Sequence, residues 1–174
     1  MNHLIYVCNA IDDLTKYERN ITTDSPACSR KVFLNSQGLN QNDVRPIILS
    51  LGRGKSNYSL SYFKSKVSRI NGVPIIYAPF INFKFISEIV SFLWPLVLML
   101  RFKRKKGNKV FLFWNRTIAY IPILIVSKIL RFRNVLDLED GNTPLNFFTL
   151  NYFKVKIKTK IYDYFCSHVL VTCN

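Results

Sequence analysis

Short apolar runs alternate with longer segments of helical pattern along this chain, and this alternation restricts the fold more than any other feature. The runs are apolar almost throughout, which is typical of strands buried on both faces of a sheet. Strands that alternate with helices favour right-handed β-α-β units and a parallel sheet. The expected strands are His3–Val7, Arg45–Leu51, Gly72–Ala78, Lys109–Trp114, Asn134–Leu138 and His168–Thr172.

Helical patterns fill most of the connections between these runs. A chain of 174 residues corresponds to one domain. The sequence therefore predicts a single Rossmann-like domain over residues 1–174, with three layers and a mostly parallel sheet of about six strands. Residues 8–24 predict a long polar loop, and residues 56–69 have no clear assignment. The expected helices cover residues 24–38, 83–102, 117–130 and 148–165.

The stretch from Val135 to Gly141 holds the densest acidic cluster of the chain, with Asp137, Glu139 and Asp140 among only 10 acidic residues. Its last three residues, Glu139 to Gly141, form the expected loop after the strand Asn134–Leu138, and ligands of parallel sheets bind beyond the carboxyl ends of the strands. A carboxylate there can accept hydrogen bonds from sugar hydroxyls or act as a base. Alternatively, Glu139 and Asp140 cap the next helix or pair with nearby cations. Paired acids also suit Mg²⁺, but no other pattern supports a metal.

Two other expected strand ends carry candidate ligand-binding residues. Arg53 lies between two glycines, where it can hold a phosphate or carboxylate, or simply belong to a turn. Asn115 and Arg116 follow the fourth expected strand, so we expect them at the same edge of the sheet as the acidic stretch. Asn115 can alternatively cap a helix.

The polar segment from Asp12 to Asp24 is a further candidate because it leads to a helix start at Ser25–Pro26. Free backbone N–H groups at such a start favour an anion or a capping carboxylate. No G-x-G-x-x-G pattern follows the first expected strand, which argues against a dinucleotide cofactor.

The chain is strongly basic: 25 Lys and Arg against 10 Asp and Glu give a net charge of +15. This charge favours an anionic partner. A basic patch follows an apolar helix and suits an anionic membrane surface, or is a solvated helix end. The apolar segments 86–100 and 117–130 are shorter than the roughly 20 residues of a membrane span, so buried or surface helices are favoured over spans. The patch consists of Arg101, Lys103, Arg104, Lys105 and Lys106.

Two further features bear on partner and compartment. The aromatic residues fall mostly within apolar runs, which does not favour nucleic-acid binding. The spacing of Cys8, Cys28, Cys166 and Cys173 fits neither a zinc site nor a disulfide framework. We therefore expect reduced cysteines in a reducing compartment, and the N-terminus has no signal-peptide pattern.

Four motifs together resemble the N-terminal half of bacterial GT-B-fold glycosyltransferases of the group 1 type, and the resemblance covers nearly the whole chain. It implies an acceptor-binding domain that takes a sugar or a lipid-linked sugar. The nucleotide-sugar donor would bind a second, C-terminal domain that this sequence lacks, so the chain itself would bind no cofactor. The motifs are Thr22-Thr23-Asp24-Ser25-Pro26-Ala27, Leu49-Ser50-Leu51-Gly52-Arg53-Gly54, Phe113-Trp114-Asn115 and Val135-Leu136-Asp137-Leu138-Glu139-Asp140-Gly141.

The resemblance implies a role in surface polysaccharide or glycolipid assembly, on the inner face of the cell membrane. Transferase activity of this chain alone is not expected, because the donor domain is missing. Two alternatives stay open: a non-catalytic partner of a separately encoded C-terminal domain, and a small basic membrane protein with two short apolar helices. The expected acceptor cleft comprises Thr15, Lys16, Thr23, Asp24, Arg53, Asn115, Arg116, Glu139, Asp140 and Gly141.

Overall fold

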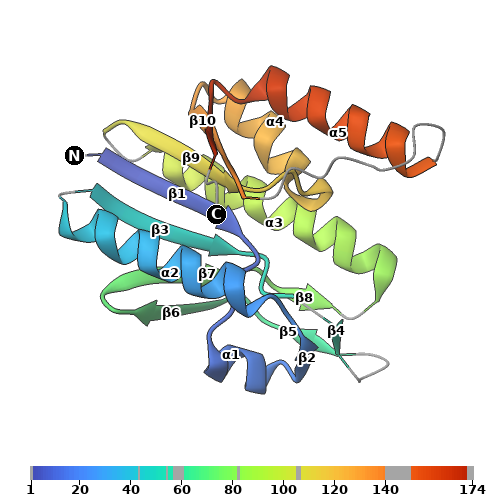
Figure 1. Cartoon of the computed structure of the whole chain (residues 1–174). Helices are drawn as coiled ribbons and strands as arrows, with labels where there is room; N and C mark the ends of the chain where they lie inside the picture. Colours follow the sequence, from blue (N-terminus) through green and yellow to red (C-terminus); the bar gives the residue numbers. More distant parts are fainter. Residues whose placement is uncertain are drawn as a thin grey trace.

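The chain folds into an α/β domain around a seven-stranded, mostly parallel sheet (Figure 1). The computed structural model describes residues 2–42, 44–53, 55–56, 61–81, 83–104, 107–139 and 150–171. The strands of the sheet are β1 (Asn2–Cys8), β3 (Val44–Ser50), β6 (Lys66–Ile70), β7 (Val73–Tyr77), β9 (Lys109–Trp114), β10 (Arg133–Leu138) and β11 (His168–Val171).

The strand order is β11-β10-β9-β1-β3-β7-β6. All neighbours pair in parallel except β6, which runs antiparallel to β7 at the edge. Without β6, the parallel strands follow the Rossmann order 3-2-1-4-5-6. The predicted Rossmann-like α/β class is therefore confirmed.

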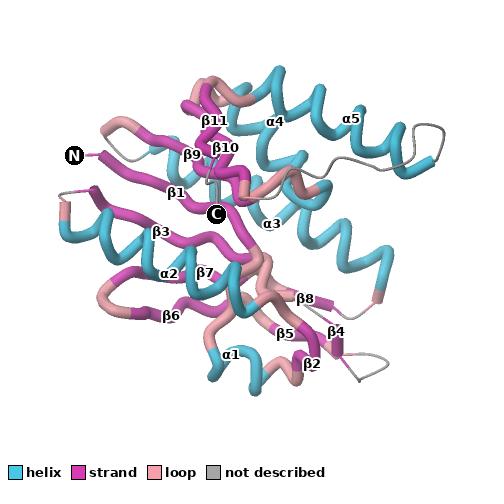
Figure 2. Tube along the Cα trace, viewed as in Figure 1, coloured by secondary structure: helices cyan, strands magenta, loops and turns pink. Residues whose placement is uncertain are grey.

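Helices cover both faces of the sheet, as Figure 2 shows. The helix α2 (Pro26–Gln41) packs on β3 and β7, while α3 (Lys84–Arg104), α4 (Ile121–Ile129) and α5 (Leu150–Phe165) form a layer on the other face. This division follows from right-handed crossovers, because the chain moves along the sheet in one direction up to β7 and in the opposite direction afterwards.

One hydrophobic core joins the sheet to both helical layers. Aromatic side chains fill much of it, and Tyr6, Phe111, Phe113, Tyr120 and Tyr162 are almost completely buried. Cys8 and Cys28 are buried and free, and Cys166 is free and partly buried. The expectation of reduced cysteines holds for these three; Cys173 lies outside the described residues.

The predicted loop over residues 8–24 was wrong, because it contains the helix α1 (Asp13–Glu18) and the strand β2 (Ile21–Thr23). Asp12 caps this helix: its carboxylate accepts a hydrogen bond from the backbone N–H of Thr15 and so stabilises the first turn. The strand β2 pairs with β4 (Lys55–Ser56).

Apart from Ser56 of β4, the described part of the unassigned stretch contains two strands, β5 (Tyr62–Phe63) and β6. The strand β5 pairs with β8 (Phe80–Ile81), and β6 pairs with β7. Exposed and partly buried residues alternate along β6, as expected for an edge strand covered on one face only.

The apolar segment 117–130 divides into a short 3-10 helix, η1 (Ile118–Tyr120), and α4. Ile123 and Leu124 of α4 are completely buried, because α4 packs on β10. No helix in the described part of the chain has the length and apolar character needed to cross a membrane.

Candidate functional site

The carboxyl ends of β1 and β9 mark the point where the chain order of the sheet reverses. In Rossmann-like sheets a crevice opens there, and ligands bind in it. Asn9 directly follows β1, Asn115 follows β9 and Glu139 follows β10. The fold thus brings residues that are far apart in the sequence to one edge of the sheet.

Six residues at this point form a polar and aromatic group, which we call the switch-point cluster. Its buried charged member is Asp137 of β10, with 4% of its surface exposed. The hydroxyl of Tyr6, in the middle of β1, donates a hydrogen bond to Asp137. Burial and this hydrogen bond raise the pKa of Tyr6 far above its ordinary value. The cluster comprises Tyr6, Lys31, Trp114, Asn115, Asp137 and Glu139.

Lys31 reaches the cluster from α2 and lies between two carboxylates. Its Nζ is 3.5 Å from Oδ1 of Asp137 and 3.8 Å from Oε1 of Glu139. It also lies 4.7 Å from the centre of the Trp114 ring, in cation–π geometry. The side chains of Lys31 and Glu139 are 18% and 20% exposed, against 5% for Asp137. Lys31 and Glu139 are therefore charged members of the cluster that a ligand can reach.

Asn115 connects the ends of β9 and β10. Its Oδ1 accepts the backbone N–H of Glu139 at 2.9 Å, and its own backbone N–H donates to the carbonyl of Asp137 at 2.8 Å. Its φ of 51° lies in the left-handed region, which asparagine adopts more readily than most residues. Asn115 thus holds Glu139 at the rim.

Arg53 is joined to the end of β1 through Asn9. The backbone N–H of Arg53 donates to Oδ1 of Asn9 at 3.1 Å, and its carbonyl accepts from the Asn9 amide. The pair fixes the loop after β3 beside the loop after β1. Cys28, in the first turn of α2, lies near Lys31 and the acids of the cluster, and burial raises the pKa of its thiol to about 12.

The remaining predicted cleft residues lie elsewhere or are engaged within the protein. Thr15 is buried, and its hydroxyl donates to Asp12 at 2.9 Å. Lys16 and Asp24 form an ion pair at 2.8 Å. Arg116 turns towards α5, where it pairs with Asp163 at 3.3 Å.

Thr23 is exposed on β2, next to the strand β4. Thr15 and Lys16 therefore lie on α1, and Thr23 and Asp24 lie on or directly after β2, so none of the four belongs to the switch-point cluster. Two other candidates, Asp140 and Gly141, lie outside the described residues.

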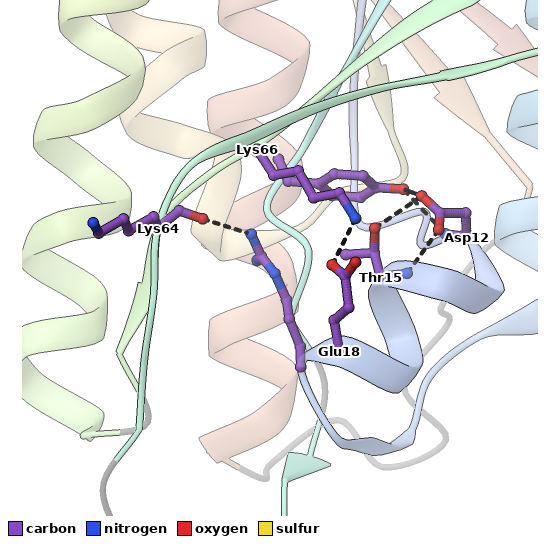
Figure 3. A network of polar contacts seen from close by, with 7 residues as sticks. Asp12, Thr15, Glu18, Lys64 and Lys66 are labelled. Atoms are coloured by element: carbon purple, nitrogen blue, oxygen red, sulfur yellow. Dashed lines mark hydrogen bonds and ion pairs between the residues drawn. The ribbon is translucent and has the colours of Figure 1, made fainter.

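A second polar network fastens α1 to the sheet, and Figure 3 shows part of it. The Tyr77 hydroxyl donates to Asp12 at 2.5 Å, and Lys66 of β6 pairs with Glu18 of α1 at 2.6 Å. Arg19 is 3% exposed and donates to the carbonyls of Gly52, at 2.9 Å, and Lys64, at 3.2 Å. Each group has its partner within the protein, so we interpret this network as structural.

Two adjoining hollows of about 510 and 600 Å³ lie beside α2 and share Leu34 and Asn35. Lys31 lines the first and Asp137 lines the second, so both hollows border the switch-point cluster. The other lining side chains are mostly apolar, and they include Leu170 and Val171 of β11.

Sequence reasoning missed Lys31 and Tyr6 as members of the site and left Asp137 out of the predicted cleft. A signal existed for the last two, because a buried aspartate and a buried tyrosine hydroxyl both need hydrogen-bond partners. Lys31 carried no such signal, because a lysine on a helix is normally a solvated cation.

The chemistry of the cluster suits a hydroxylated ligand better than a strong anion. Two carboxylates against one lysine leave an excess of negative charge, which disfavours phosphate. A carboxylate accepts hydrogen bonds from hydroxyl groups and a lysine donates them, so both can contact the same sugar ring. Within the described residues, no group of three or more His, Cys, Asp or Glu side chains could hold a metal ion.

Comparison of this chain with family models, with curated proteins and with solved structures gives no match. The functional argument therefore depends on the fold and on the geometry of the site.

Proposed function

We propose that this chain is the acceptor-binding domain of a nucleotide-sugar-dependent glycosyltransferase, and that the switch-point cluster contacts the sugar acceptor. Two features support the proposal: the four motifs that resemble this family, and the Rossmann-like fold of the chain. The observation that carries it is the position of Lys31 and Glu139, partly exposed at the rim where parallel sheets of this order bind ligands.

Each exposed member of the cluster has a role in the proposal. The Glu139 carboxylate accepts hydrogen bonds from acceptor hydroxyls, and the Lys31 ammonium donates one. Asp137 does not contact the acceptor but pairs with Lys31, and Tyr6 in turn donates a hydrogen bond to Asp137. Asn115 fixes the backbone of Glu139.

The proposal assigns the donor nucleotide-sugar to a different domain, as the resemblance implies. We therefore expect the purified chain to transfer no sugar by itself. Transfer from a nucleotide-sugar by this chain alone, measured with a radiolabelled donor, would refute the assignment of the donor to a different domain.

Acceptor binding can be measured through Trp114, whose ring lies against Lys31. The chain has two tryptophans, so Trp94→Phe leaves Trp114 as the single reporter. We expect members of a panel of soluble mono- and disaccharides to change its fluorescence. Glu139→Gln should weaken that binding by about tenfold or more, because hydrogen bonds to a charged group contribute about 1.5–3 kcal/mol.

Glu18→Gln is the matched control, because Glu18 is an exposed carboxylate on α1 that pairs with Lys66 and does not belong to the switch-point cluster. It should leave sugar affinity unchanged. Equal affinities for the Glu139→Gln and Glu18→Gln variants would contradict the assignment of Glu139 to the acceptor site.

A further inference from the structure

An apolar stripe covers the outer face of α3. Its members recur every three or four residues, which places them on one side of a helix. They are 44% to 56% exposed, whereas Met99 and Phe102, on the opposite side, are buried in the core. The α3 stripe consists of Ile86, Ile89, Leu93, Val97 and Leu100.

Basic residues follow the apolar stripe at the carboxyl end of α3. Arg101, Lys103 and Arg104 occupy the last turn of α3, and all three are exposed. Arg104 lies four residues after Leu100 and so continues the stripe along the same side of the helix. Every charged side chain described on α3 is basic.

A basic hollow adjoins this end of α3, at the amino-terminal edge of the sheet. Its volume is about 440 Å³, and Lys103, Lys109, Arg131 and Arg133 line it. None of its lining residues is acidic. A hollow with four cations suits phosphate oxygens, for which lysine and arginine are the usual donors.

The helix α5 lies in the same layer as α3 (Figure 1), and it also exposes apolar side chains. Phe153 and Ile157 are 54% and 59% exposed. Lys154, Lys156 and Lys160 are exposed around them. The layer thus presents apolar side chains together with cations on two helices.

We propose that the outer face of the α3 and α5 layer docks on an anionic phospholipid bilayer. The α3 stripe enters the boundary between headgroups and acyl chains, and the basic hollow takes a lipid phosphate. The inference does not depend on the proposed acceptor site, which lies at the other edge of the sheet.

Charge distinguishes this partner from a second copy of the chain. Each copy carries a net charge of +15, and two of these faces would bring like charges together. An anionic leaflet attracts the same cations and also accommodates the apolar stripe. Arg101, Lys103 and Arg104 belong to the basic patch predicted from sequence, whereas Lys105 and Lys106 lie outside the described residues.

The test is sedimentation of the full chain with vesicles of phosphatidylcholine, with or without an equimolar amount of phosphatidylglycerol. We expect binding to the anionic vesicles only. The double variant Leu93→Gln/Val97→Gln should lower the partition coefficient about tenfold or more, because it removes two apolar contacts. Lys103→Gln/Arg104→Gln should lower it about 25-fold, at about fivefold for each cation.

Two double variants away from this layer serve as controls: Leu14→Gln/Val67→Gln for exposed apolar residues and Lys64→Gln/Arg69→Gln for exposed cations. Both should bind as the wild type does, and circular dichroism should show all variants folded. The proposal is overturned if the wild type does not bind anionic vesicles, or if the controls lose as much binding as the test variants. It is also overturned if soluble glycerol phosphate displaces the chain completely, or if the α3 variants change only the oligomeric state.

Discussion

At the scale of single residues, Asp137 decides how the switch-point cluster is built. It is buried, accepts from Tyr6 and pairs with Lys31. Tyr6 is completely buried, so its hydroxyl cannot reach water when the carboxylate is removed. Removing one partner of a buried ion pair lowers the free energy of unfolding by more than the pair contributes in net, because the other group is left buried without its partner.

We therefore expect Asp137→Ala to lower the free energy of unfolding by about 3 kcal/mol, as urea denaturation can measure. Asp163→Ala is the control, because the Asp163 side chain is 53% exposed in its pair with Arg116. That change should cost under about 1 kcal/mol. Similar losses for the two variants would show that Asp137 is not the structural centre of the cluster.

Gly52 is the second decisive single residue. Its φ is 58°, and an added Cβ would lie 2.7 Å from Nη1 of Arg19 and 2.9 Å from Tyr77. We expect Gly52→Ala to destabilise the protein by about 2 kcal/mol or more. By contrast, Gly38→Ala should stabilise it by about 0.5–1 kcal/mol, because Gly38 lies within α2 with open space around its Cα. The thermal midpoints of the two variants should therefore move in opposite directions.

At the scale of elements, α1 is a six-residue helix that depends on its cap and on the network that fastens it. Helices this short are not stable in isolation. Asp12 serves both purposes, since it caps α1 and accepts from Tyr77. Burial alone would raise the pKa of Asp12, but the hydrogen bonds from Tyr77 and Thr15 outweigh burial and lower it below its ordinary value of 3.8.

This lowered pKa has a definite consequence for acid stability. A carboxylate with a lowered pKa stabilises the folded state at pH values above about 3.8, and the contribution disappears as the pH falls through the folded value. We expect the wild type to lose stability between about pH 5 and pH 3 more steeply than Asp12→Asn, which has no charge to lose. Urea denaturation across this range measures both slopes, and equal slopes would contradict the role of Asp12.

At the scale of the whole molecule, the net charge of +15 acts against compactness. Like charges repel across the surface. At about 0.5 M, salt screens the repulsion between exposed charges that are more than a few Å apart. The partly buried pairs of Lys31 are screened much less.

We therefore expect about 0.5 M NaCl to raise the urea midpoint above its value at low ionic strength. A neutral solute at the same osmolarity controls for effects other than screening. A midpoint that falls with NaCl would mean that surface ion pairs outweigh the repulsion.

The alternation of apolar runs with helical segments was enough to predict the α/β class and a mostly parallel sheet. Runs such as Phe111–Phe113 are apolar throughout because both faces are covered, and this property is local to the sequence. The helix α1 and the edge strand β6 escaped prediction because both are short and depend on contacts from elsewhere, such as the Tyr77 hydroxyl on Asp12.

The candidate site shows the same division. Sequence reasoning placed Asn115 and Glu139 at strand ends, because a strand end is readable from a local pattern. Only the tertiary structure brought Lys31 from α2 and Tyr6 from β1 to Asp137, and only it paired Lys16 with Asp24. Such contacts join residues up to 131 positions apart. The local sequence around one partner therefore cannot predict which distant side chain will lie beside it after folding.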